Sequence, residues 1–129
     1  MESVEKNYPD GTRQYSYFVN KYNEKNGQSM EYFPNGQLKS KIYFVKGLEE
    51  GRGVYYYETG ELKEVQYFNK GKKNGPDTLY SQDGLVRNIS NFKNGLKHGI
   101  FIKFKIGSDS LDIESFYSND SLVSLKKHE

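Results

Sequence analysis

The chain contains no cysteine, alanine or tryptophan, and it has only three prolines and two methionines in 129 residues. Without cysteine it can form no disulfide framework, thiolate zinc site, iron–sulfur cluster or cysteine nucleophile. Because alanine is the strongest helix former, its absence argues against a helical protein. No apolar run approaches the roughly 20 residues that a membrane-spanning helix needs, and residues 1–10 lack the apolar stretch of a signal peptide. We therefore expect a cytoplasmic protein, or a periplasmic one if a leader has been removed.

What is present favours β-structure. The chain has 12 tyrosines, 8 phenylalanines and 13 glycines, which are residues of strands and turns. Leucine, isoleucine, valine and phenylalanine make up 30 of the 129 residues, and the net charge is only +2. That apolar share lies above the level of disordered chains. The composition and length predict one folded domain.

The dominant feature of the sequence is an internal period of 24 residues. Three series of glycines follow it: Gly27, Gly51, Gly75 and Gly99; Gly36, Gly60 and Gly84; Gly47, Gly71 and Gly95. Two aromatic columns follow it as well: Tyr32, Tyr56, Tyr80 and Phe104; Phe44, Phe68, Phe92 and Phe116. We assign both columns to packing and expect each ring to lie against the ring one unit along.

Each unit reads as a β-hairpin. Turn sequences such as Pro34-Asn35-Gly36 separate segments rich in aromatic and β-branched residues, and a second glycine turn joins each unit to the next. The prediction is an all-β fold, an elongated single-layer antiparallel meander of four to five hairpin repeats of about 24 residues. It would contain eight to ten strands and extend roughly 40 to 50 Å. The expected units span residues 8–27, 28–51, 52–75, 76–99 and 100–120, with a C-terminal cap at 118–129.

Two structural questions stay open at this level. If the Asn35-Gly36 turn has two residues, Phe33 lies opposite Leu38, and if it has three, Tyr32 does. The choice decides the face on which the whole second strand places its side chains. The segment 121–127 could be a short helix or a last strand.

The recurring segments resemble a known family. Residues 32–40 (YFPNGQLKS) and 56–64 (YYETGELKE), with the joints at 69–75 (NKGKKNG) and 93–99 (KNGLKHG), look like MORN-repeat-variant proteins, the group that includes YwqK-type antitoxins. The likeness covers residues 8–104, and it weakens beyond Gly107. It implies a meander of hairpins that serves as a binding scaffold, placed in bacteria beside toxins as an antitoxin or immunity protein. It carries no catalytic motif.

Enzymatic and cofactor patterns are nearly absent. Of the two histidines, His98 stands where other joints have Asn74 or Glu50, which indicates a turn residue. No motif of a serine hydrolase, a zinc protease or a phosphate-binding loop is present. Gly51-Arg52-Gly53 has no following helix that could complete a phosphate site. We therefore expect no enzyme, no cofactor and no metal.

Positions that vary between units, and that bear aromatic or cationic side chains, are the candidate partner-binding residues. They are Phe33, Lys39, Tyr43, Tyr55, Tyr57, Lys63, Tyr67 and Arg87. Tyrosine and arginine together are typical of binding hot spots. The alternative is that these rings form a second packed face of a thin sheet.

Charge distribution favours a partner of opposite sign. Residues 70–105 carry eight Lys and Arg against two Asp and Glu, whereas residues 106–129 carry two against five. This basic segment could attract an acidic protein or an anionic lipid, or it could protect sheet edges from pairing. The leading hypothesis is a protein partner, a cognate toxin, with a membrane surface as the alternative. No nucleic-acid partner is expected, because a net charge of +2 is far from the usual footprint.

Overall fold

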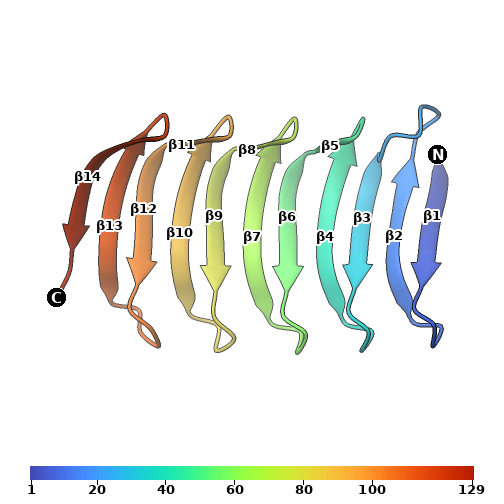
Figure 1. The fold of residues 1–129 in the computed structure, drawn as a ribbon, viewed down its shortest axis with the longest axis horizontal. Helices are drawn as coiled ribbons and strands as arrows, with labels where there is room; N and C mark the ends of the chain where they lie inside the picture. The colour runs from blue at the N-terminus through green and yellow to red at the C-terminus, as the bar shows by residue number, and fades with distance from the viewer.

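The computed structural model describes all 129 residues, and they form one open layer of antiparallel β-sheet (Figure 1). Three strands of two residues pair at the joints between units: β5 (Leu48–Glu49), β8 (Lys72–Lys73) and β11 (Leu96–Lys97). The other strands are β1 (Glu2–Asn7), β2 (Arg13–Val19), β3 (Gly27–Tyr32), β4 (Leu38–Val45), β6 (Gly51–Tyr56), β7 (Leu62–Asn69), β9 (Gly75–Tyr80), β10 (Val86–Lys93), β12 (Gly99–Phe104), β13 (Leu111–Ser118) and β14 (Ser121–Lys127).

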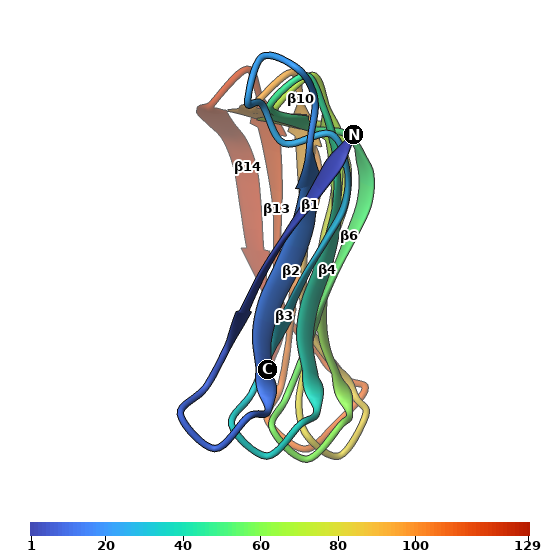
Figure 2. The same cartoon turned by 90° about the vertical axis from the view of Figure 1, so that its right-hand side faces the viewer.

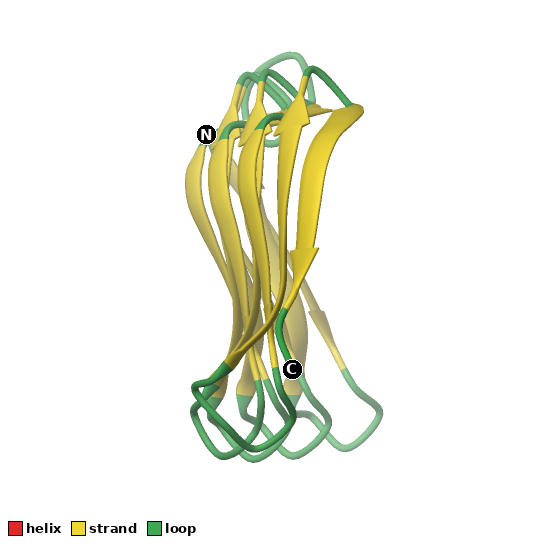
Figure 3. Cartoon of the chain, turned by 90° about the vertical axis from the view of Figure 1, so that its left-hand side faces the viewer, coloured by secondary structure: helices red, strands yellow, loops and turns green.

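These longer strands lie side by side in the order of the chain, so the predicted single-layer meander is confirmed. Seen from its edge, the sheet is one twisted layer with no element on either face (Figure 2). The path has eleven strands, more than the eight to ten predicted, because β1 pairs with β2 and residues 121–127 form a strand. Figure 3 shows strands and loops but no helix. The structure therefore has no long, apolar helix of the kind that spans a membrane.

The hairpin turns settle the open register. Tyr32 lies opposite Leu38, and the Phe33 N–H donates to the Gln37 carbonyl at 2.8 Å, which leaves three residues in the loop. The next residue, Lys39, forms a β-bulge between the pairs Tyr32–Leu38 and Glu31–Ser40. The same arrangement recurs in the following two units, so Lys63 and Arg87 are also bulge residues. We call the long side of the sheet that carries these hairpin turns the turn edge.

The joints between units lie along the opposite long side, which we call the joint edge. Here two-residue turns connect β4 to β5, β7 to β8 and β10 to β11. Lys70 and Gly71 have φ angles of 50° and 83°, and the other joints repeat this pair of positive values. Two successive positive φ angles define the type I′ turn, which matches the twist of an antiparallel pair. The glycine supplies the second of them without a steric penalty.

One packing column differs from the prediction. Gly75 pairs with Phe92, but Gly99 pairs with Tyr117 rather than with Phe116. The turn between Phe104 and Leu111 contains one residue more than its counterparts, and this residue shifts the phase of β13. The assignment of Phe116 to packing is therefore wrong: its side chain is 42% exposed.

The expected stacking of rings from unit to unit is also wrong. The close aromatic pairs are Tyr15–Tyr17, Phe92–Phe101 and Phe101–Tyr117, and none joins two members of one column. Members of a column lie two strands apart, or about 9.6 Å at the usual spacing. In the phenylalanine column the strand between them contributes a glycine, such as Gly51 beside Phe68. The Phe68 ring also lies against Gly53, where a Cβ atom would approach it to 3.3 Å.

Burial is slight, because the sheet has no second layer. Only five residues are buried, among them Val19, Val54 and Val65, and no side chain is completely enclosed. The backbone compensates with 81 hydrogen bonds between main-chain groups, 60 of them within the strands. The sheet is thus held mainly by its ladder of strands and by partial burial of many side chains.

The sheet has two exposed faces, which follow from register and alternation. We call one the Tyr43 face: it carries Tyr43 on β4, Arg52 and Tyr67, which pair across β6 and β7, and Val54 and Val65. The other is the Tyr55 face. It carries Tyr55, Glu64, Asp77, Phe44, Phe68, Phe92 and Tyr117.

Candidate binding surfaces

The structure places the eight predicted binding residues in three locations. Tyr43 and Tyr67 lie together on the Tyr43 face, and Tyr55 lies on the opposite face. The remaining five lie along the turn edge: Phe33, Lys39, Tyr57, Lys63 and Arg87. The predicted set is therefore not one surface, because the face that a strand residue occupies depends on a register that the sequence leaves open.

The turn-edge residues form repeated pairs. The Lys39 ammonium lies 5.7 Å from the centre of the Phe33 ring, and Lys63 lies at the same distance from the Tyr57 ring. Both distances fall within the range of a cation–π contact. The Tyr57 hydroxyl also donates to the Tyr80 carbonyl of the next unit. Tyr57 thus links two units, and this role accounts for an aromatic residue there.

Arg87 occupies the bulge position of the third hairpin, where Lys39 and Lys63 stand in the others. Its Nη1 atom is buried and has no hydrogen-bond partner. Asp83 in the adjacent turn has its pKa lowered, first by a hydrogen bond from the Ser81 hydroxyl and only weakly by the Arg87 charge. The guanidinium is therefore not tightly paired with that carboxylate.

A polar network lies at the centre of the Tyr55 face. The Gln66 amide donates to Glu64 at 2.9 Å and to Asp77 at 3.3 Å, and the Lys73 ammonium contacts Asp77 at 2.9 Å. Burial raises the pKa of Glu64 to about 7, and its contact with Asp77 adds to the effect. Burial also raises the pKa of Tyr55, and the charge of Glu64 is the next largest cause. The face is acidic here, and its charges are satisfied within the sheet.

Joint lysines cover the rings of the Tyr55 face. Lys25 lies 4.8 Å from the Tyr17 ring centre and 5.0 Å from that of Phe44. In the same way Lys73 lies over Phe92 and Lys97 lies over Tyr117. These contacts protect ring surface that would otherwise be open to a partner.

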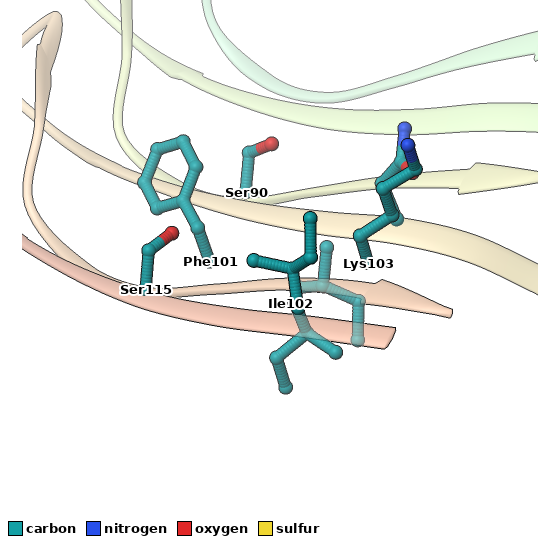
Figure 4. Close-up of a pocket in the computed structure, with 8 residues that line it drawn as sticks. Ser90, Phe101, Ile102, Lys103 and Ser115 are labelled. Atoms are coloured by element: carbon teal, nitrogen blue, oxygen red, sulfur yellow. The ribbon is translucent and has the colours of Figure 1, made fainter. Parts of the chain in front are cut away.

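The same face has a shallow groove between β10, β12 and β13. It has a volume of about 340 Å³, and Figure 4 shows Ser90, Phe101, Lys103 and Ser115 around it. Phe101 is held between Phe92 and Tyr117, with ring centres 5.8 and 4.7 Å away. The small serine side chains leave the hollow open. The lining offers hydroxyl groups and one lysine, with no carboxylate.

The Tyr43 face carries a line of exposed apolar side chains that crosses most of the sheet. Five large side chains point out in one line across the sheet, each between 38% and 51% exposed: Phe18, Tyr43, Tyr67, Ile100 and Phe116. We call this line the exposed apolar row. Sequence reasoning found Tyr43 and Tyr67 but missed the other three. The signal that could have found Ile100 and Phe116 is the position that follows each joint glycine, because Gln28, Arg52 and Ile100 lie opposite Tyr43, Tyr67 and Phe116.

A depression of about 270 Å³ adjoins the exposed apolar row between β3, β4 and β6. Lys41, Tyr43, Arg52 and Tyr56 line it, together with Gln28. The ion pairs of the structure are Arg13–Glu5, Lys73–Asp77 and His128–Glu114, so neither cation of the depression is paired. Lys41 and Arg52 are not among the binding residues predicted from the sequence.

The two histidines have structural partners. The Nδ1 atom of His98 accepts the Asn119 N–H at 3.3 Å, and His128 contacts Glu114 at 2.7 Å. No group of three or more His, Cys, Asp or Glu residues is arranged to hold a metal ion. No protein-family model matches the chain, and no curated protein matches it significantly. The resemblance to MORN-repeat-variant proteins therefore stays an expectation drawn from the sequence.

Proposed function

We propose that this chain is a non-catalytic repeat module that binds one protein partner on its sheet. The observation that carries the proposal is the exposed apolar row, which crosses the sheet from β2 to β13 without a covering element. Soluble chains seldom leave large aromatic side chains aligned on one surface unless a partner covers them. The Tyr43 face, rather than the turn edge, is the main binding surface in this proposal.

The partner class comes from the family resemblance. YwqK-type antitoxins suggest that the partner is a bacterial toxin, which this chain would neutralise by covering its active site or an essential interface. A sheet that is already formed suits that role, because its strands need no ordering on binding.

Co-expression tests this proposal. The chain is expressed with the toxin encoded beside it in the native host, and growth is measured together with complex formation on a sizing column. We expect growth to be restored and the two chains to elute together. Continued killing at an excess of the chain, with no complex, would overturn the proposal.

A membrane surface is the second candidate, and one observation favours it. Five of the eight cations in residues 70–105 lie near the joint edge: Lys70, Lys72, Lys73, Lys93 and Lys97. Clusters of four to eight basic residues typically bind anionic lipid. Flotation with phosphatidylglycerol vesicles at low and high salt decides the matter, and an absence of flotation at low salt would exclude this candidate.

A further inference from the structure

The charges of the two faces differ, and the difference is largest where the Tyr43 face has its depression. From β2 to β12 the strand residues of this face include the cations Lys41, Arg52, Lys72 and Lys93, besides Arg13 at the start of β2, and no carboxylate. The carboxylates of the same region, such as Glu64 and Asp77, point to the Tyr55 face. The acids of the Tyr43 face lie near the two ends of the sheet. There Glu5 pairs with Arg13 at 3.3 Å and Glu114 with His128 at 2.7 Å.

Lys41 and Arg52 are placed to act together. Lys41 lies opposite Val54, and Arg52 is two residues from Val54 on the same strand and the same face. Such diagonal neighbours lie about 7 to 8 Å apart, with their Cβ atoms somewhat closer, a separation that one carboxylate can bridge. The Lys41 side chain is half-buried between Met30 and Val54, whereas Arg52 is exposed. A half-buried cation without a counter-ion gains most from an incoming anion.

The surroundings of the pair favour an anion with apolar neighbours. The aromatic rings of Tyr43 and Tyr56 line the depression, and neither hydroxyl is bonded within the chain. The exposed apolar row passes through Tyr43 and extends over eight strand spacings, or about 38 Å. That length matches the footprint of a globular protein domain in a standard interface, about 800 Å² per partner. A membrane or a nucleic acid would require a denser set of cations than this face holds.

On the basis of the proposed function, we infer that the Tyr43 face recognises an acidic protein surface. A carboxylate of the partner lies between Lys41 and Arg52, and the apolar side chains around that carboxylate pack on the exposed apolar row. The Arg52 guanidinium and the Lys41 ammonium hold the carboxylate, and the tyrosine hydroxyls donate to its remaining lone pairs. The turn-edge pairs and the Tyr55 face lie outside this contact.

A peptide titration followed by NMR tests the inference. The ¹⁵N-labelled chain is titrated with a capped peptide, Glu-Phe-Glu-Leu-Glu, and with the same peptide carrying glutamine in place of glutamate. The readouts are the Nε–Hε signal of Arg52 and the side-chain amide of Gln28, both at the depression. We expect the acidic peptide to shift them with half-saturation at about 1 mM and the glutamine peptide to bind at least about tenfold more weakly.

Two charge-matched variants locate the site. Lys41→Glu with Arg52→Glu should weaken the acidic peptide by at least about tenfold, because it removes both cations. Lys103→Glu with Lys105→Glu changes the net charge equally, away from the Tyr43 face, and should keep binding within about twofold. Amide spectra show whether each variant keeps the fold. An unmoved Arg52 signal, or an equal loss in both variants, would overturn the inference. A response to phosphatidylglycerol vesicles without one to the peptide would overturn it in favour of a lipid surface.

This outcome is separate from that of the toxin experiment. A toxin that binds the Lys41→Glu, Arg52→Glu variant as well as the unchanged chain overturns the inference and leaves the proposed function standing. An acidic peptide that binds at Arg52, in a chain that binds no toxin, supports the inference and overturns the proposed function.

Discussion

At the residue scale, Glu64 shows how a single layer of sheet can still perturb a carboxyl group. Its neighbours across the strands are Tyr55 and Leu79, and the Gln66 amide and the Asp77 carboxylate lie beside it. These groups exclude part of the water from a residue that has no covering layer. The penalty falls on the charged form, so the pKa of Glu64 rises to about 7 from its usual 4.5.

The chain should become more stable as the pH falls from 8 to 5. Since the pKa of Glu64 is higher in the folded state, its contribution is complete below about 4.5 and is lost as the pH rises through about 7. Glu64→Gln is neutral at every pH and should remove most of this slope. Urea midpoints at several pH values measure the effect.

Glu61→Gln is the matched control for that experiment. Glu61 is exposed in a hairpin turn, and a hydrogen bond from the Thr59 hydroxyl lowers its pKa below the usual 4.5. Its titration therefore lies below the measured range, and this variant should keep the slope. A Glu64→Gln variant with the slope of the unchanged chain would contradict the assignment.

At the element scale, one side-chain device joins every unit to the next. The side chains of Asn26, Glu50, Asn74 and His98 accept the backbone N–H of the following joint turn at 3.0, 2.8, 3.0 and 3.3 Å, respectively. A backbone bond runs beside each of them, such as the Gly95 N–H to the Lys73 carbonyl at 2.8 Å. Amide, carboxylate and imidazole acceptors are thus equivalent here. This equivalence explains why the column has no single residue type.

Asn74→Ala should lower the free energy of unfolding by about 1 kcal/mol. The substitution leaves the Asn94 N–H without its acceptor at 3.0 Å, and the site is solvated enough that water replaces part of the bond. Asn74→Asp keeps an acceptor oxygen and should retain most of the stability. Urea unfolding of the three proteins measures the difference. Equal losses for alanine and aspartate would show that the bond contributes nothing.

The repeating elements are also what the sequence predicts best. Turn glycines and the 24-residue spacing predict the hairpins and joints, because both turn types need positive φ angles at fixed positions. It is harder to predict which residues of a strand face which side of the sheet after an irregular turn. The turn after Phe104 holds one extra residue, and nothing in its Gly107-Ser108 sequence says on which side of the turn that residue is absorbed. The exposure of Phe116 and the pairing of Tyr117 follow from that single residue.

At the scale of the whole molecule, the binding surface depends on register more than on composition. The aromatic residues of a repeat can be read from the sequence, but their division between two faces requires the pairing of every strand. Tyr43 and Tyr55, both predicted from the sequence as partner-binding residues, lie on opposite faces. Arg52 is not among the residues predicted from the sequence, yet the register places it opposite Tyr67 and beside the exposed apolar row.

Because each strand contacts mainly its two neighbours, a complete unit should be removable from the middle of the chain. Deleting residues 52–75 joins Gly51 to Pro76, which repeats the native Gly75–Pro76 step and places β9 where β6 stood. This deletion keeps the direction of every remaining strand, the face on which each side chain lies, and the turns at the joint edge. We expect a folded β-protein whose urea m-value is lower by about a fifth, since 24 of 129 residues are lost and m follows the surface exposed on unfolding.

The matched control deletes half a unit, residues 52–63, which removes one strand and one turn. This deletion joins Gly51 directly to Glu64, so the remaining part of β7 would have to start at the joint edge. In the native sheet β7 ends there, so the strand would be reversed and its side chains could not keep their faces or their pairing with the neighbouring strands. Circular dichroism and urea unfolding should show a cooperative transition for the 24-residue deletion and none for the 12-residue deletion. If both deletions fold equally well, the stability of the sheet does not require whole 24-residue units. A sheet that tolerates a reversed strand does not depend on the alignment of its turns and of its repeated side-chain columns.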